Sequence, residues 1–209
     1  YYELGVNFPG VQVRGQTVDM NAESYVININ EVPVAKGKTM QGCILVGEPL
    51  EQLQLFNIEG KETIHPIDGS IVTWVNESYK EVCVQAGFRM WDIAEYLILH
   101  LSYVLRKHAH EFLGLQEIQT LLNELEKTHP ALVKELVPKV ITVLQLAEIF
   151  QRLVQEDVAI RDLKNIFSTL AQWAEVERNT LVLTEHIRSG LKRYITHKYA
   201  GHGNTLAVY

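Results

Sequence analysis

Four residues in the middle of the chain, His100, His108, His110 and Glu111, are of types that bind transition metals. His100 and His108 fall on the same side of a predicted helix, but two turns separate them by about 12 Å along its axis. His108 and His110 are two residues apart and point in different directions. One metal ion cannot join side chains placed in this way, so we interpret them as packed or boundary histidines and expect no metal.

A second group of residues, Glu156, Asp157, Arg161 and Asp162, could form an ion pair in an active site. Charges with this spacing occur far more often as salt bridges at a helix start or as subunit contacts. The sequence has no GxSxG, P-loop, GxGxxG or HExxH motif that would supply a nucleophile, a phosphate loop or a metal. We therefore expect no catalysis and no cofactor.

Aromatic and basic residues near the end of the chain could be interpreted as a nucleic-acid surface. Trp173, Tyr194 and Tyr199 have helical spacing, which favours core or interface positions over a stacking platform. The basic residues there are Lys192, Arg193, His197 and Lys198. They complement the dipole at a helix C-terminus without any partner. Because the net charge of the 209 residues is −6, we expect no nucleic-acid partner.

The segment 94–127 positions the histidines and divides the chain into two halves. Apolar residues recur at helical spacing from Leu97 to Phe112, and Asp92 with Glu95 forms a capping-box pattern before them. Gly114 ends this helix and a second one follows. Short strand-like runs precede the segment, and predicted helices joined by short loops follow it, as in a compact bundle. The predicted fold class is α+β.

The N-terminal half is predicted to contain strands at 11–14, 24–30, 32–35 and 71–75, with a short apolar run at 42–46. Proline and glycine become frequent between residues 47 and 88, and long-range periodicity is lost there. We expect this segment to form a separate small α/β unit inserted into the first one. Cys43 and Cys83 show no CxxC spacing and are predicted to be reduced thiols in the core.

Several stretches of the sequence resemble the cytoplasmic domain of the export-gate protein of bacterial type III secretion systems. This family is shared by virulence-associated injectisomes and the flagellar export apparatus. The stretches are LGV at 4–6, FPGV at 8–11, YVININEVPVA at 25–35, HAHEFLG at 108–114, QEIQ at 116–119, LLNELEK at 121–127, LVKELVP at 132–138, IRDLK at 160–164 and LTEHIR at 183–188. Their order and spacing, taken together, are specific to the family, and the resemblance runs across almost the whole chain.

The resemblance implies a cytoplasmic domain of four subdomains in a bacterial inner-membrane protein whose membrane part is absent here. We assign 1–46 and 89–110 to the first α/β subdomain, 47–88 to the inserted second, 111–190 to the helical third and 191–209 to the start of the fourth. The fourth would be mostly missing. Because the chain also begins without methionine, we expect it to be a fragment of a longer protein.

The resemblance also implies a platform for protein export rather than an enzyme. Members of the family form a ring, typically of nine subunits, below the export pore. They receive chaperone–substrate complexes, gatekeeper proteins and the stalk of the export ATPase. Arg161 and Asp162 are the corresponding candidates for charges across the ring interface.

A chaperone-binding groove between the first two subdomains is implied as well, with Ile67, Asp68, Trp74 and Leu99 near its walls. Trp74 and Leu99 could instead pack the two subdomains together. Flagellar relatives carry an aromatic residue where this sequence has Ile67 and Asp68, so an injectisome-type protein fits better. Ala159 stands where a helix-capping serine or proline is usual, so the helix that follows would lack its side-chain cap.

Two other functional classes remain open from the residues themselves. One is a soluble enzyme with a site between the α/β and helical halves. The other is a regulatory or nucleic-acid-binding helical module. The missing nucleophile–base pattern disfavours the enzyme, and the acidic balance of charge disfavours the nucleic-acid module.

Overall fold

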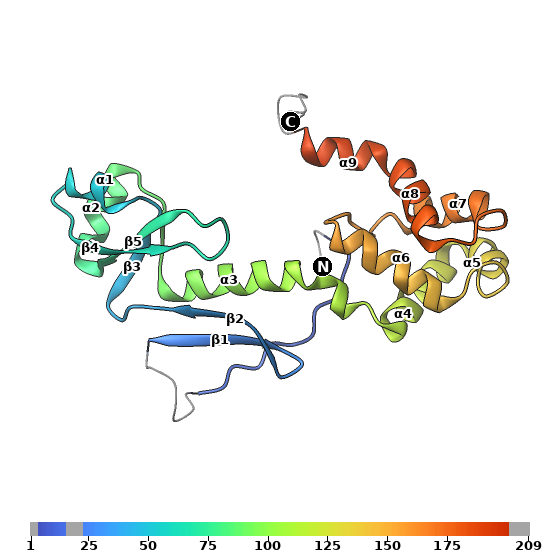
Figure 1. The fold of residues 1–209 in the computed structure, drawn as a ribbon, viewed down its shortest axis with the longest axis horizontal. Coiled ribbons are helices and arrows are strands. Elements are labelled where there is room, and N and C mark those ends of the chain that lie inside the picture. Colours follow the sequence, from blue (N-terminus) through green and yellow to red (C-terminus); the bar gives the residue numbers. More distant parts are fainter. Residues whose placement is uncertain (1–3, 16–22, 201–209) are drawn as a thin grey trace. The chain divides into compact units, whose positions relative to one another are not determined.

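A computed structural model of the protein describes residues 4–15 and 23–200, which fall into two compact units. The sheet unit comprises residues 11–106, and the helical unit comprises residues 1–10 together with 107–209. Figure 1 shows the elements of both units. In the described residues, no helix has both the length and the apolar character that a membrane span needs.

The sheet unit contains two antiparallel sheets and one long helix. Its elements are β1 (Ser24–Ile29), β2 (Val32–Lys38), β3 (Cys43–Val46), α1 (Leu50–Gln54), β4 (Gly60–Ile64), β5 (Ile71–Asn76), the 3₁₀ turn η1 (Glu77–Tyr79), α2 (Lys80–Ala86), β6 (Met90–Trp91) and α3 (Ile93–Lys107). β1 pairs only with β2, and the larger sheet has the strand order β4-β5-β3-β6. The strand expected at 11–14 is wrong, because residues 11–15 have no regular structure.

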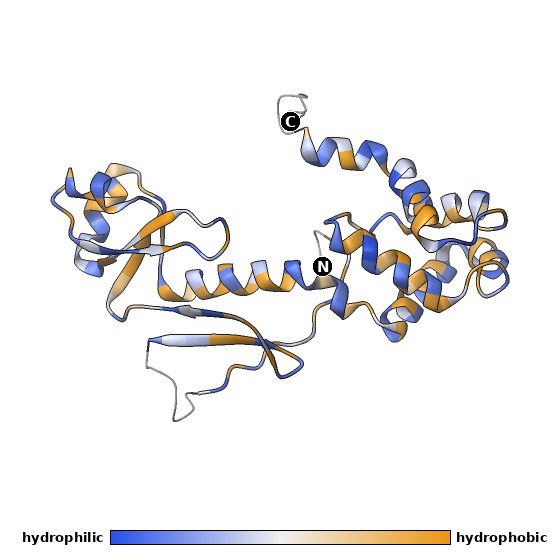
Figure 2. Ribbon diagram, viewed as in Figure 1, coloured by the Kyte–Doolittle hydropathy of each residue, from blue (hydrophilic) through white to orange (hydrophobic). Residues whose placement is uncertain are grey.

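The four-stranded sheet buries apolar residues on both faces. On one face, Ile44 and Val46 of β3 and Val75 of β5 pack with Leu53 of α1 and Cys83 of α2. Figure 2 shows β3 and β5 as apolar along most of their length. This is the pattern that a strand covered on both sides requires. Cys83 is a free thiol in this core.

The opposite face of the sheet packs against α3. Leu45, Val72 and Trp74 point to this side, and Tyr96 of α3 covers them. They alternate along β3 and β5 with the residues of the first face, because successive side chains of a strand point to opposite faces. The sheet therefore separates two small apolar cores.

The β1–β2 hairpin is shaped by its turn and by Pro33. Asn30 and Glu31 both adopt positive φ, and this favours a tight turn whose twist matches the strands. The pairing shifts by one residue between Ile27 and Asn28, which lies opposite Pro33. A proline fits such an irregular position, because it cannot donate a hydrogen bond to the ladder.

The larger sheet extends past both ends of the predicted insertion. β5 lies in a different sheet from β1, but β3 precedes residue 47 and β6 follows residue 88, and β3 pairs with both β5 and β6. The expected limits of 47 and 88 are therefore too narrow. The rise in proline and glycine marks the loops of the insertion. It does not mark β3 and β6, because their pairing depends on residues far apart in the sequence.

Residues 4–10 also lie elsewhere than expected. They were assigned to the first α/β subdomain, yet Leu4 and Val6 belong to the core of the helical unit. The backbone N–H of Ile160 donates to the carbonyl of Leu4 at 2.9 Å. Gly5 has a φ of +81°, and a Cβ there would lie 2.9 Å from Cγ of Arg161. The segment packs with the helices because they bury its apolar side chains.

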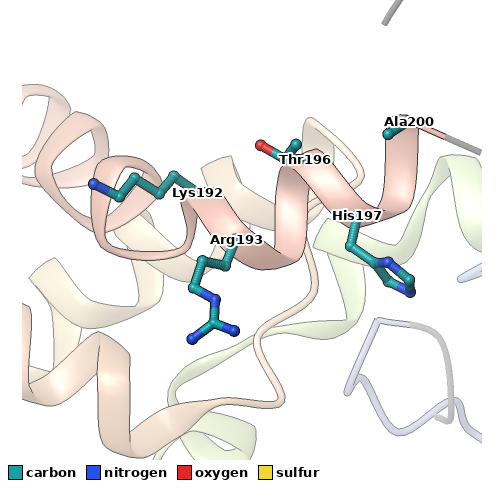
Figure 3. Close-up of a pocket in the computed structure, with 5 residues that line it drawn as sticks. All are labelled: Lys192, Arg193, Thr196, His197 and Ala200. Atoms are coloured by element: carbon teal, nitrogen blue, oxygen red, sulfur yellow. The ribbon is translucent and has the colours of Figure 1, made fainter. Parts of the chain in front are cut away.

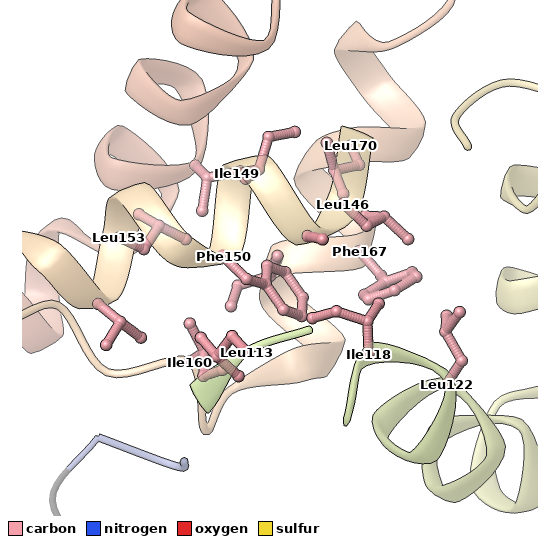
Figure 4. Packing of buried hydrophobic residues seen from close by; sticks show 14 of the residues in the cluster. Leu113, Ile118, Leu122, Leu146, Ile149, Phe150, Leu153, Ile160, Phe167 and Leu170 are labelled. Atoms are coloured by element: carbon pink, nitrogen blue, oxygen red, sulfur yellow. The ribbon is translucent and has the colours of Figure 1, made fainter. Parts of the chain in front are cut away.

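The helical unit is a bundle built around α6. Its elements are η2 (Ala109–Phe112), α4 (Leu115–Thr128), α5 (Pro130–Leu136), α6 (Val143–Gln155), α7 (Leu163–Trp173), α8 (Thr180–Gly190) and α9 (Lys192–Tyr199). Phe150 of α6 and Phe167 of α7 are fully buried, with ring centroids 6.4 Å apart in an edge-on arrangement. Figure 4 shows Leu113, which follows η2, and side chains of α4 and α7 gathered around α6. Of the segment 191–209 assigned to the start of the fourth subdomain, residues 201–209 lie outside the described residues.

Helices α6 and α7 of this unit begin at side-chain caps. Thr142 and Gln145 form a capping box at α6, in which the N–H of Gln145 donates to Oγ1 of Thr142 at 3.2 Å. α7 begins at Leu163, and Asp162 accepts a hydrogen bond from the N–H of Asn165 at 3.1 Å. The expectation that this helix lacks a side-chain cap is wrong, since Ala159 is a buried residue of the preceding loop.

Candidate functional site

The candidate residues Ile67 and Asp68 lie in the loop that joins β4 to β5. Oδ1 of Asp68 accepts hydrogen bonds from the N–H of Ser70 at 3.0 Å and from its hydroxyl at 2.7 Å. The same oxygen lies 2.9 Å from Nδ1 of His65. The N–H of His65 donates to the carbonyl of Ser70 at 2.8 Å, which closes the loop at its base. The side chain of Asp68 thus holds its own loop together.

This hydrogen bonding also sets the charge of the loop. The hydroxyl and the N–H of Ser70 lower the pKa of Asp68 to about 2, against an opposing effect of burial and with a lesser contribution from His65. The carboxylate is therefore ionised at neutral pH. It remains exposed, but the partners just described belong to the loop itself, so a substitution at Asp68 changes the shape of the loop as well as its charge.

His65 anchors the loop to the sheet. Its side chain is buried, and its ring stacks on Trp91 of β6 with centroids 5.5 Å apart and planes 30° apart. Its Nε2 atom is buried and has no hydrogen-bond partner among the described residues. The His65 ring is therefore held by one hydrogen bond, at Nδ1, and by stacking on Trp91.

A polar contact joins the β1–β2 hairpin to α3. The hydroxyl of Tyr25 lies 2.6 Å from Nδ1 of His100, and the Tyr25 ring packs edge-on against Tyr96. Burial, with a smaller effect of His65, lowers the pKa of His100. Burial, followed by the neighbouring Tyr96, raises the pKa of Tyr25. Both side chains are therefore neutral at pH 7, and the hydroxyl can donate to the imidazole.

The remaining partner-binding candidates differ in their exposure. Trp74 is only 4% exposed and packs edge-on against Tyr96 at 5.4 Å. It belongs to the core beneath α3 and cannot contact a partner in this fold. Leu99 of α3 and Ile67 are half-buried, and Asp68 is exposed.

The charged candidates of the helical unit have structural contacts. Asp162 caps α7, and Cγ of the exposed Arg161 packs close to Gly5. The neighbouring carboxylates Glu156 and Asp157 lie close to cations. Arg188 is 2.7 Å from Glu156, and Lys198 is 2.5 Å from Asp157. These pairs connect α8 and α9 to the loop between α6 and α7.

The histidines near Gly114 form local contacts. Nδ1 of His108 lies 2.6 Å from Oε1 of Glu111, and Nδ1 of His110 is buried with no partner among the described residues. Within residues 4–15 and 23–200, no group of three or more histidine, cysteine or acidic side chains is arranged to hold a metal ion.

The predicted basic cluster lies on α9, beside a shallow depression of about 370 Å³ (Figure 3). The residues that line it are Lys192, Arg193, Thr196, His197 and Ala200. A single helix and its C-cap supply all of these side chains. Such a surface cannot enclose a small ligand, and we interpret it as a basic patch.

Sequence reasoning missed His65, Ser70 and Tyr25, which organise the site. It considered His100 only as a metal ligand and missed its hydrogen bond to Tyr25. A local signal existed for one of them, since aspartate followed two residues later by serine is a common turn pattern. The Tyr25–His100 contact spans 75 residues of sequence and leaves no local pattern.

Comparison with known proteins gives one consistent result. A model described as the FHIPEP family matches residues 1–209. The chain is 38% identical over 209 residues to the Low calcium response locus protein D of Yersinia pestis, covering 100% of this chain and 29% of that protein. It is 32% identical over 206 residues to the Flagellar biosynthesis protein FlhA of Bacillus subtilis, covering 99% of this chain and 30% of that protein. The chain therefore spans less than a third of the length of these relatives.

Solved structures show the same likeness. A structure of the Chlamydia pneumoniae CdsV protein matches 100% of this chain and 60% of its own, with a TM-score of 0.89 and 35% identity. A structure of the Chlamydia pneumoniae CdsV and CdsO protein complex matches 100% of this chain and 59% of the matched chain, with a TM-score of 0.88 and 37% identity. The nonameric EscV cytosolic domain from a type III secretion system matches 97% of this chain and 59% of its own chain, with a TM-score of 0.69 and 27% identity. The predicted α+β fold class is confirmed.

Proposed function

The chain belongs to the FHIPEP family of type III secretion export-gate proteins, and from this premise we propose that it is part of a ring-forming platform that receives export substrates. It corresponds to a cytoplasmic part of such a gate. In the whole protein, we place it on the cytoplasmic side of a bacterial inner membrane. The family is one of secretion proteins, and the function proposed is binding and assembly rather than catalysis.

The observation that carries a docking role is the ordered loop between β4 and β5. Asp68 fixes its conformation, and Ile67 lies at its tip. Ile64 and Ile71 pair directly across the two strands at the base of the loop, and they are 70% and 53% exposed. An ordered apolar surface at the end of a hairpin is a suitable place for a folded partner to bind.

We place chaperone–substrate complexes on this surface, with Ile67 and Asp68 at the loop and Leu99 on α3. The test compares the binding of a cognate secretion chaperone–substrate complex to the wild type and to Ile67→Arg. The expected result is at least a tenfold loss of affinity, because a buried interface centre does not tolerate an unpaired charge. Circular dichroism checks that the variant folds.

A matched control uses an exposed apolar residue of the other unit. Leu144 of α6 is 68% exposed, and Leu144→Arg should leave the affinity unchanged. Asp68→Arg is a weaker test, because it also breaks the hydrogen bonds of the loop. Equal affinity of the wild type and Ile67→Arg would place the docking surface elsewhere.

Assembly and the other partners are part of the same proposal. The likeness to a nonameric domain supports a ring of nine subunits in the whole protein, with Arg161 and Asp162 near the subunit interface. The likeness to CdsV in its complex with CdsO supports a partner of the ATPase-stalk type. A gatekeeper protein is a further partner of the platform. Charge reversal at Arg161 in the whole protein should weaken the ring, and unchanged assembly would remove this residue from the interface.

A further inference from the structure

A second apolar surface lies on the face of the larger sheet that α1 and α2 cover. It consists of Leu55, Phe56, Val84 and Phe88, which we call the α1–α2 patch. Leu55 is 82% exposed, Val84 60% and Phe56 46%, and Phe88 is half-buried. The rings of Phe56 and Phe88 pack edge-on with centroids 5.2 Å apart, so the segments that follow α1 and α2 meet here. A single exposed leucine needs no explanation, but apolar residues gathered from two helices do.

The ends of the two helices build this patch in the same way. The N–H of Ile58 donates to the carbonyl of Leu53, and the N–H of Phe88 donates to that of Cys83, both at 3.1 Å. Each helix is followed by a residue with positive φ, Asn57 after α1 and Gly87 after α2. This is the Schellman arrangement, which turns the chain sharply and packs the residue after the turn against the last helical turn. The backbone thus fixes where the patch residues lie.

The two segments that carry the patch, 40–59 and 77–89, are rich in carboxylates. They contain Glu48, Glu51, Glu59, Glu77 and Glu81, and their basic residues are Lys80 and Arg89, so their formal charge is five negative against two positive, or −3. Glu51 stands four residues before Leu55 and Glu81 three residues before Val84, which places each on the same side of its helix as a patch residue. We call the five carboxylates of these segments the acidic rim.

We propose that the α1–α2 patch binds a basic amphipathic helix of a partner protein. Apolar side chains of that helix would cover Leu55 and Phe56, and its lysine and arginine residues would face the acidic rim. The patch consists of side chains at the ends of two helices, so side-chain contacts rather than strand pairing would hold the partner, and a helix satisfies its own backbone hydrogen bonds.

Charge and packing argue against other occupants. An acidic rim repels the anionic lipids of a cytoplasmic membrane surface. A second copy of this chain could offer α9, its basic helix. However, Ile195 of α9 packs against the core of its own unit, so this apolar side chain is not available to cover the patch. The surface also lies on the sheet face opposite to α3, so it is distinct from the docking surface that includes Leu99.

The test measures the binding of two synthetic 18-residue peptides to the whole chain by fluorescence anisotropy. Both peptides form amphipathic helices with leucine on one face, one with lysine and arginine on the other face and one with glutamate. The basic peptide should bind roughly tenfold more tightly than the acidic one, and higher salt should reduce this difference. Leu55→Ser should weaken binding of the basic peptide by roughly tenfold. The double variant Glu51→Lys/Glu59→Lys should weaken it as well.

Matched variants give the controls. Leu144→Ser removes an exposed leucine from the helical unit, and Glu124→Lys reverses an exposed charge there. Both should bind like the wild type, and so should Ile67→Arg, which separates this proposal from the docking role of the β4–β5 loop. The proposal is overturned if both peptides bind equally, or if Leu144→Ser loses as much affinity as Leu55→Ser. Self-association or vesicle binding that Leu55→Ser abolishes would also overturn it, in favour of a second copy or a membrane.

Discussion

The two units of this protein are stabilised in different ways. The helical unit buries one continuous cluster with members from η2 and from α4 through α8. The sheet unit divides its apolar residues between two small clusters on the two faces of the larger sheet. Polar links supplement these clusters, such as Tyr25 with His100, and Thr73, whose hydroxyl donates to the carbonyl of Glu48 at 2.9 Å. The helical unit has polar links as well, such as Arg188 with Glu156. The two units therefore differ in how their apolar residues are divided, with one cluster in the helical unit and two in the sheet unit.

The largest effect should follow from a cavity in the helical unit. Phe150→Ala removes a fully buried ring that packs against Phe167. We expect it to lower the free energy of unfolding of this unit by about 4 kcal/mol. Denaturant unfolding followed by far-UV circular dichroism measures the loss, and Leu144→Ala is the exposed control. A loss below about 1 kcal/mol would show that the core is less tightly packed than it looks.

A cavity in the sheet unit should cost somewhat less. Trp74→Ala removes the side chain that fills the core beneath α3, and we expect a loss of about 3 kcal/mol, because the smaller core can collapse further. The fluorescence of Trp91 in the sheet unit and Trp173 in the helical unit reports which unit unfolds. If Trp74→Ala shifts the unfolding transition reported by Trp173 as much as the one reported by Trp91, the two units do not unfold separately and the comparison fails.

The sheet unit should also lose stability in acid. Burial lowers the pKa of His100 below its ordinary 6.5, so the folded state keeps this imidazole neutral. The unfolded chain takes up a proton as the pH falls through that value, and the free energy of unfolding therefore decreases from about pH 7 towards pH 5. Below the pKa of the folded state the decrease ends. Thermal unfolding across this range tests it.

His100→Gln is the control for the acid effect. Glutamine can still bind the hydroxyl of Tyr25, but it does not titrate. A variant with the same pH dependence as the wild type would assign the effect to another group. Asp68 cannot supply it, because the pKa of this carboxyl is about 2 and its contribution is lost only as the pH falls through that value.

The smallest effect concerns Asp162, for which two roles are open. If Asp162 acts as the cap of α7, Asp162→Ala should lower the free energy of unfolding by about 1 kcal/mol. Asp162→Asn should change it by only a few tenths of a kcal/mol, because asparagine also caps helices. As a charge across a ring interface it should be sensitive to both substitutions. Unfolding of the isolated chain, set beside ring formation by the whole protein, distinguishes the two roles. Equal stability of both variants would mean that the cap contributes nothing.

Local features of the fold were readable from the sequence. Asp92 and Glu95 form the predicted capping box, with the N–H of Glu95 donating to Asp92 at 2.8 Å. Gly114 precedes α4 as expected, but the long helix α3 already ends at Lys107 and not at Gly114. Capping signals need only a few neighbouring residues, and this is why these helix starts were found.

Long-range features were not readable. Nothing in the residues around Leu4 shows that it packs with α6 and α7 rather than with the strands that follow it. The pairing of β3 with β6 and the burial of Trp74 depend on which surfaces meet. For the candidate site, the resemblance to the family pointed to Ile67 and Asp68. Only the hydrogen bonds in the structure show that Asp68 holds the conformation of its loop.

The packing of Leu4 beside Ile160 has a consequence for the order of events during synthesis. The two residues are separated by 156 positions, and the whole sheet unit lies between them. At bacterial rates of translation, Leu4 leaves the ribosome roughly 10 to 30 s before its partner. The sheet unit can fold in that interval, while the first apolar residues of the helical core wait exposed. A ribosome that pauses before residue 160 would therefore lengthen the time in which chaperones or proteases reach this segment.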